Sequence, residues 1–107
     1  MSTNDLKVCR SLIKQVRNIQ RKIPAIKVEV VTHGLGVELL FNNSRFSNVL
    51  KAMANKGIML LACRNTLNER GLSSTSDLIS VARIIPSAFA HLIVRKSEGW
   101  SYIKVGF

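Results

Sequence analysis

The chain has 107 residues, which is enough for one domain with its own core and too few for two. Its residues are 47% hydrophobic and 21% charged, a composition that excludes a disordered or collagen-like chain. Sixteen lysines and arginines stand against six acidic residues. The resulting net charge of +10 favours an anionic partner such as nucleic acid, anionic lipid or an acidic protein.

The cysteine count excludes two further classes. Cys9 and Cys63 are too few for the disulfide scaffold of a secreted domain, and with His33 and His91 they lack the spacing of a zinc finger. No apolar run approaches the roughly 20 residues of a membrane span, and the first ten residues lack the apolar stretch of a signal peptide. We therefore expect a soluble cytoplasmic protein with no membrane segment, no metal and no cofactor.

Residues 5–22 have the pattern of an amphipathic helix that Asn4 or Asp5 caps. Its apolar side chains recur every three or four residues: Leu6, Cys9, Leu12, Ile13, Val16, Ile19 and Ile23. Its basic side chains keep a period of their own nearly opposite: Lys7, Arg10, Lys14, Arg17 and Arg21. Two interpretations stay open, a solvated outer face or a surface that binds a nucleic-acid backbone or an acidic protein.

Helices and strands alternate along the rest of the chain. Strands are expected at 26–32, 58–62, 81–84 and 100–105, with helices at 45–56, 65–71 and 87–96 and a short one at 37–41. Strands separated by helices need right-handed crossovers, so residues 1–107 are predicted to form one α/β domain with a mostly parallel sheet. Ligands bind such sheets beyond the carboxyl ends of the strands, where the loops 33–36, 63–66 and 86–87 are expected to converge.

Cys63 is the strongest candidate for chemistry in these loops. It follows a buried strand and precedes a helical turn, whose N–H groups favour a thiolate, and Arg64 adds a positive charge. A nucleophile, a redox sensor and a carrier of sulfane sulfur are all open roles, and so is the alternative of a small buried hydrophobe. Cys9, within the apolar stripe, is expected to be structural.

Each of the other loop residues has more than one possible role. His33 is either a proton shuttle or anion ligand near Cys63, or a side chain that hydrogen-bonds its own turn. Ser87 has no evident base, so it is expected to cap a helix or donate to an anion. The expected lining of the pocket around Cys63 is His33, Gly34, Arg64, Asn65, Thr66 and Ser87. His91, in the middle of a helix, is expected at the surface or an interface.

Three stretches together resemble the DsrE/DsrF-like family, which has the YchN-like fold: VEVVTHG at 28–34, KGIMLLACRNTL at 56–67 and IIPSAFAHLIVRKSEGWSYIK at 84–104. The resemblance implies a three-layer α/β/α sandwich around a five-strand parallel sheet, and assembly into dimers, trimers or hexamers. It implies a sulfur-relay protein in which Cys63 carries persulfide sulfur between a donor and an acceptor protein, more a carrier than a turnover enzyme. In that role the basic residues would dock an acidic partner. A binding module for nucleic acid or an acidic protein, or a structural oligomer subunit, each without thiol chemistry, are the alternatives.

The chain departs from the family pattern in two places. Ala88 stands where relatives usually have glycine, and the apolar strand expected before the first helix is missing, which leaves four of the five strands. Because that strand is expected to be central, its loss predicts a gap in the middle of the sheet. A start placed too late, a rearranged sheet or a neighbouring chain in the gap would each account for it, and we expect weak stability or obligate oligomerisation.

Overall fold

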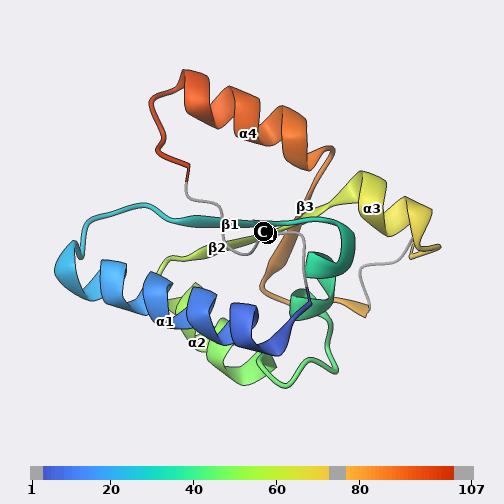
Figure 1. Cartoon of the computed structure of the whole chain (residues 1–107), viewed down its shortest axis with the longest axis horizontal. Helices are drawn as coiled ribbons and strands as arrows, with labels where there is room; N and C mark the ends of the chain where they lie inside the picture. Colours follow the sequence, from blue (N-terminus) through green and yellow to red (C-terminus); the bar gives the residue numbers. More distant parts are fainter. Residues whose placement is uncertain (1–3, 73–76, 103–107) are drawn as a thin grey trace.

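The computed structural model describes residues 4–72 and 77–102 and has three layers, in which a parallel sheet lies between helices on both faces (Figure 1). The elements in chain order are α1 (Leu6–Lys22), β1 (Glu29–Thr32), the 3-10 helix η1 (Gly34–Leu40), α2 (Ser47–Asn55), β2 (Met59–Cys63), α3 (Arg64–Glu69), β3 (Ala82–Ile85) and α4 (Ala88–Ser97). The predicted fold class is confirmed.

The sheet has the order β1-β2-β3, and both pairs are parallel. The expectation of a gap in the middle of the sheet is wrong. β1 pairs directly with β2 from Glu29 opposite Met59 onward, and Met59 N–H also donates to Val28 O at 3.0 Å. Strands that follow each other through a helical crossover commonly lie side by side. Here β1 lies beside β2, and β2 lies beside β3.

The expected fourth strand is not found in the part of it that the structure describes. Trp100 to Tyr102 have no strand assignment, and residues 103–105 lie outside the described residues. Trp100 instead stacks on the end of α4, where the Arg95 guanidinium lies 5.0 Å from the centre of its ring. Trp100 N–H also donates to Arg95 O at 3.1 Å, so residues 98–102 close the end of α4 and then lead from it toward the sheet (Figure 1).

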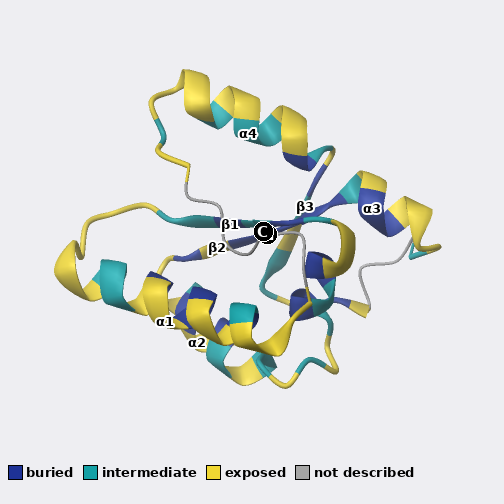
Figure 2. Cartoon of the chain, viewed as in Figure 1, coloured by how far each residue is buried: buried dark blue, intermediate teal, exposed yellow. Residues whose placement is uncertain are grey.

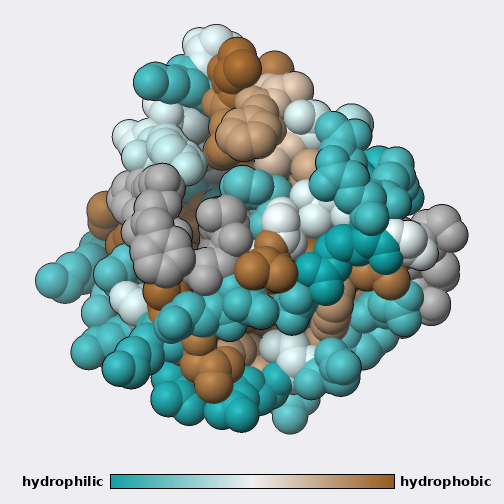
Figure 3. Space-filling view, turned by 45° about the vertical axis from the view of Figure 1, so that its right-hand side comes forward, coloured by the Kyte–Doolittle hydropathy of each residue, from teal (hydrophilic) through white to brown (hydrophobic). Residues whose placement is uncertain are grey.

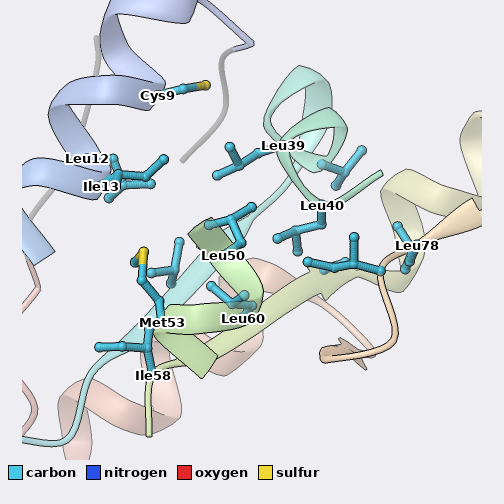
Figure 4. Packing of buried hydrophobic residues seen from close by; sticks show 14 of the residues in the cluster. Cys9, Leu12, Ile13, Leu39, Leu40, Leu50, Met53, Ile58, Leu60 and Leu78 are labelled. Atoms are coloured by element: carbon cyan, nitrogen blue, oxygen red, sulfur yellow. The ribbon is translucent and has the colours of Figure 1, made fainter. Parts of the chain in front are cut away.

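The core lies between the sheet and the layer formed by α1, α2 and η1. Leucines of η1 and α2 meet the apolar face of α1 over β2 (Figure 4). Asp5 caps α1, as its position predicts, because its Oδ1 accepts from the N–H groups of Lys7 at 2.9 Å and Val8 at 3.2 Å. Cys9 is part of this core, as its place in the apolar stripe predicts. The five basic residues of the predicted stripe on α1 are all exposed.

The opposite face of the sheet carries α4, which is far more exposed than the sheet beneath it (Figure 2). Hydrophobic side chains gather at the surface over α4, at the top of the space-filling view (Figure 3), where Phe89, Ile93 and Val94 are 68%, 70% and 53% exposed. A patch of this kind on one helix is typical of a protein–protein contact.

One ion-pair cluster fastens α4 to the sheet. Glu29 of β1 accepts from His91 Nε2 at 2.8 Å, and Arg95 holds both of its carboxylate oxygens at 3.0 Å. His91, expected at the surface or an interface, is half-buried and faces the sheet. Because the carboxylate of Glu29 is itself nearly buried against α4, His91 is turned inward to hydrogen-bond it.

Candidate functional site

The candidate site lies where the three parallel strands end at one edge of the sheet. Cys63 is the last residue of β2 and immediately precedes α3. The N–H of Ala88, the first residue of α4, donates to Cys63 Sγ at 3.4 Å. The N–H of Gly34, just after β1, donates to Thr66 Oγ1 in α3 at 3.0 Å. Hydrogen bonds thus join the segments that follow β1, β2 and β3 in one cluster that contains the sulfur.

The surroundings of Cys63 favour the thiolate. Burial raises the pKa of its thiol, but the amides of Thr66, Ala88 and Asn65 and the Thr66 hydroxyl lower that pKa by more, so it lies below the ordinary value of 9.0. The amides of Asn65 and Thr66 belong to the first turn of α3, so the N-terminus of that helix faces the sulfur. The Thr66 hydroxyl accepts from Gly34, which leaves its own hydrogen for the sulfur.

Cys9 shows what burial does without such surroundings. Both cysteines are buried, with 3% of Cys9 and 5% of Cys63 exposed. Burial, followed by the negative charge of Asp5, raises the pKa of the Cys9 thiol. The pKa values of two equally buried thiols are therefore shifted in opposite directions. A cysteine that merely fills space behaves as Cys9 does.

The low exposure of Cys63 corrects one expectation from the sequence. The sequence predicts a thiol that lines an open pocket, and the structure instead covers the sulfur, which counts against sulfur transfer in this conformation. The cause is the same geometry that lowers its pKa, because α3 begins at the sulfur and Ala88, only 1% exposed, closes over it from α4. The two pockets found on the surface of the described residues lie elsewhere, and Cys63 lines neither of them.

His33 and Phe89 form the outer edge of the site. His33 is half-buried, and its ring centre lies 5.3 Å from that of Phe89 with the ring planes tilted by 57°. Burial lowers the pKa of His33, so its ring is neutral at neutral pH. Among the described contacts its ring makes no hydrogen bond to Cys63, so His33 packs on Phe89 and does not pair with the sulfur.

The remaining predicted residues lie in the same loops with different surroundings. Gly34 has a φ of +54°, a left-handed conformation that suits glycine, and this turns its N–H toward Thr66. Arg64 is half-buried at the start of α3, and Asn65 beside it is exposed. Ser87 is the cap of α4, because its Oγ accepts from Ala90 N–H at 3.3 Å. The capping role predicted for Ser87 is confirmed.

Two features of the site escape sequence reasoning. The Ala88 amide is a principal donor to the sulfur, yet alanine carries no functional group that a pattern could single out. Phe89 covers His33, although its position on α4 predicts only an apolar side chain. The available signal is the Pro86-Ser87 pair, which predicts a helix start and hence a free amide at the next residue.

Thiolate chemistry is what this arrangement can perform. Across the described ranges 4–72 and 77–102, no three His, Cys, Asp or Glu side chains gather as a metal site would require. In the same residues no helix is both long and apolar enough to cross a membrane. The groups assembled here are a stabilised sulfur, a hydroxyl, backbone amides and a neutral imidazole.

Comparison with known proteins gives a family and a structural relative. The family model described as the DsrE/DsrF-like family matches residues 2–105. A solved structure of a protein of unknown function, MTH1491 from Methanobacterium thermoautotrophicum, superposes with a TM-score of 0.92 at 30% sequence identity, and the match covers 95% of this chain and 91% of that one. No significant match is found among curated proteins.

Proposed function

The chain belongs to the DsrE/DsrF-like family, and we propose that it is a sulfur-relay protein in which Cys63 carries a persulfide. The observation that carries the proposal is the lowered pKa of a nearly buried thiol, which Thr66, Ala88 and Asn65 produce together. Burial alone would keep the sulfur protonated and inert. Hydrogen-bond donors around it instead increase the fraction of thiolate, the nucleophilic form, at a given pH.

The proposed step transfers one sulfur atom without net oxidation. The Cys63 thiolate attacks the outer sulfur of a donor persulfide, the S–S bond of the donor breaks, and the donor leaves as a thiolate. Cys63 is then a persulfide that keeps the outer sulfur's proton. In the second step an acceptor thiolate attacks that outer sulfur, and Cys63 leaves as the thiolate again. Each step forms one S–S bond and breaks one.

The donors around Cys63 serve both steps. The Thr66 hydroxyl and the Ala88 amide stabilise the negative charge on sulfur before it attacks and after it leaves. Since Ala88 covers the sulfur, transfer requires the first turn of α4 to move away from β2. A carrier benefits from such cover, because it protects a stored persulfide from water-borne oxidants between encounters.

Intact-mass spectrometry tests the proposal. The protein is incubated with glutathione persulfide beside a known persulfide carrier, and we expect an adduct of about 32 Da, one sulfur atom. The Cys9→Ser variant should still form this adduct. The Cys63→Ser variant should not, and peptide mapping should place the added sulfur on Cys63.

The result that overturns the proposal is equally direct. If the known carrier is labelled and this protein shows no added mass on Cys63, the thiol is a buried structural residue. Labelling of Cys9 in place of Cys63 would have the same consequence. Thermal unfolding of each serine variant is measured in parallel, so a loss of labelling through unfolding is recognised.

A further inference from the structure

A large groove lies between α1 and α2, away from Cys63. Its volume is about 820 Å³, and residues of both helices line it. The two helices form the layer beneath the sheet in Figure 1, and one hydrogen bond joins the groove walls, from Gln20 Nε2 to Lys56 O at 2.7 Å. Because Lys56 ends α2, this bond fixes the spacing of the walls at one end of the groove.

The floor of the groove is apolar. Phe46, Val49 and Ala52 of the α2 segment line it, and Val49 and Phe46 are only part-buried while Ala52 is exposed. Ile13 of α1 and Met53 of α2 line it from the core below. An apolar partner side chain laid on this floor would remove these exposed atoms from water.

The rim of the groove is basic. Four residues of α1 and the residue that caps the end of α2 line it with positive charges, namely Arg10, Lys14, Arg17, Arg21 and Lys56. No carboxylate lines the groove, and none of these five cations pairs with an acidic side chain within residues 4–72 and 77–102. Lys7, the remaining basic residue of the predicted stripe, does not line it.

We propose that this groove binds an acidic amphipathic helix of a partner protein. A cationic rim around an apolar floor is complementary to a helix with apolar side chains on one face and carboxylates flanking them. From Arg10 to Arg21 the rim follows α1 over about 16 Å, at 1.5 Å per residue, the length of about three helical turns. An acidic helix of that length can meet every cation of the rim.

A nucleic acid fits the same groove less well. A phosphate backbone needs the cations but gains nothing from the apolar floor, and base stacking needs several aromatic rings. Phe46 is the single aromatic residue among those that line the groove. The floor, not the charge, therefore decides in favour of a protein helix.

Fluorescence polarisation with a synthetic peptide tests this inference. The probe is a labelled peptide of about 14 residues built from glutamate, leucine and alanine, with leucine at every third or fourth position. We expect Lys14→Glu combined with Arg17→Glu to raise its dissociation constant at least about tenfold. Ala52→Glu, which places a carboxylate on the floor, should raise it by a similar factor.

The matched control makes the same change in net charge at positions that lie outside the groove. Lys7→Glu combined with Lys51→Glu alters two exposed lysines that do not line it, and we expect a change of less than about threefold. A second peptide with serine in place of leucine keeps the charge and should bind at least about tenfold more weakly. Circular dichroism of each variant confirms that it is folded.

Four results would overturn the inference. One is that the acidic leucine peptide does not bind. Another is that the serine peptide binds as tightly as the leucine peptide, because charge alone would then account for the binding. A third is equal weakening by the control pair. The last is that a single-stranded oligouridine binds more tightly than the peptide and is lost in the Lys14→Glu, Arg17→Glu variant, which would assign the groove to nucleic acid.

Discussion

The amide of Ala88 points at the sulfur of Cys63 from 3.4 Å, and this one contact joins the start of α4 to the end of β2. The residue that closes the core over the sulfur is thus also a residue that stabilises its charge. The thiol is covered and its pKa is lowered for the same reason, because α3 and α4 both begin beside it at the edge of the sheet. A change that moves α4 away from β2 should therefore alter both the exposure and the pKa of Cys63.

Removal of the Thr66 hydroxyl should make Cys63 less reactive. In a Cys9→Ser background, Thr66→Val deletes a donor to the sulfur, so the pKa of Cys63 rises and less thiolate is present at neutral pH. We expect alkylation by iodoacetamide to slow by about tenfold, the equivalent of one hydrogen bond to a charged group. Thr66→Ser keeps the hydroxyl and should react at nearly the original rate. Equal slowing in both variants would show that the hydroxyl does not act on the sulfur.

The thiolate of Cys63 should also make stability depend on pH. Between the lowered pKa of the folded protein and 9.0, the ordinary value in an unfolded chain, the folded state holds a thiolate and the unfolded state a thiol. Unfolding then takes up a proton, so this contribution to the free energy of unfolding grows as the pH rises through that window and is absent below it. Urea unfolding of Cys9→Ser, compared with Cys9→Ser, Cys63→Ser from about pH 6 to about pH 9.5, measures it. A constant difference between the two variants would contradict the pKa direction.

The sequence predicts the architecture well because the relevant signals are local. The fully apolar strand at 58–62 and the cap at Asp5 each specify an element within a few residues. The alternation of these elements then leaves little choice but a parallel sheet. Which strands lie side by side is a non-local property, and there the expected gap is wrong.

The candidate site is predictable only in part for a related reason. Cys63, Thr66 and Ser87 are found from residue type and from their place after a strand. Burial of the sulfur depends on how closely α4 approaches β2, which no local pattern encodes. The pairing of Glu29 with His91 joins residues far apart in the chain, so it too emerges only from the packed structure.

Neutralising Glu29 should loosen α4. Its carboxylate is nearly buried, with 10% of the side chain exposed, and it holds Arg95 with both oxygens and His91 with one. We expect Glu29→Gln to lower the free energy of unfolding by about 2 kcal/mol, the order expected when a buried charged partner is lost.

The matched control for Glu29 is Glu98, which pairs with the same arginine from a more exposed position. Glu98→Gln should cost less than about 0.5 kcal/mol in urea unfolding. Burial raises the pKa of Glu29, but Arg95 and His91 lower it by more, so its contribution should disappear only as the pH falls below the ordinary value of 4.5. Equal effects of the two glutamine variants would mean that the buried pairing adds nothing.

The exposed apolar face of α4 should be covered by a second copy of the chain. Phe89 and Ile93 lie one helical turn apart and both are more than two-thirds exposed, at a place where the surface is otherwise rich in charge. Ile93→Asp puts a carboxylate at the centre of that face, so we expect light scattering to show smaller assemblies for this variant than for the original protein. Asn48→Asp makes the same change of charge on an exposed position of α2 and should leave the assembly intact.

Two results would show that the face of α4 is not the contact. One is that the original protein is a monomer at micromolar concentration, and the other is that both variants reduce the size of the assembly equally. Since Phe89 of this face also packs on His33, a real contact here would bring the second copy to the edge of the Cys63 site.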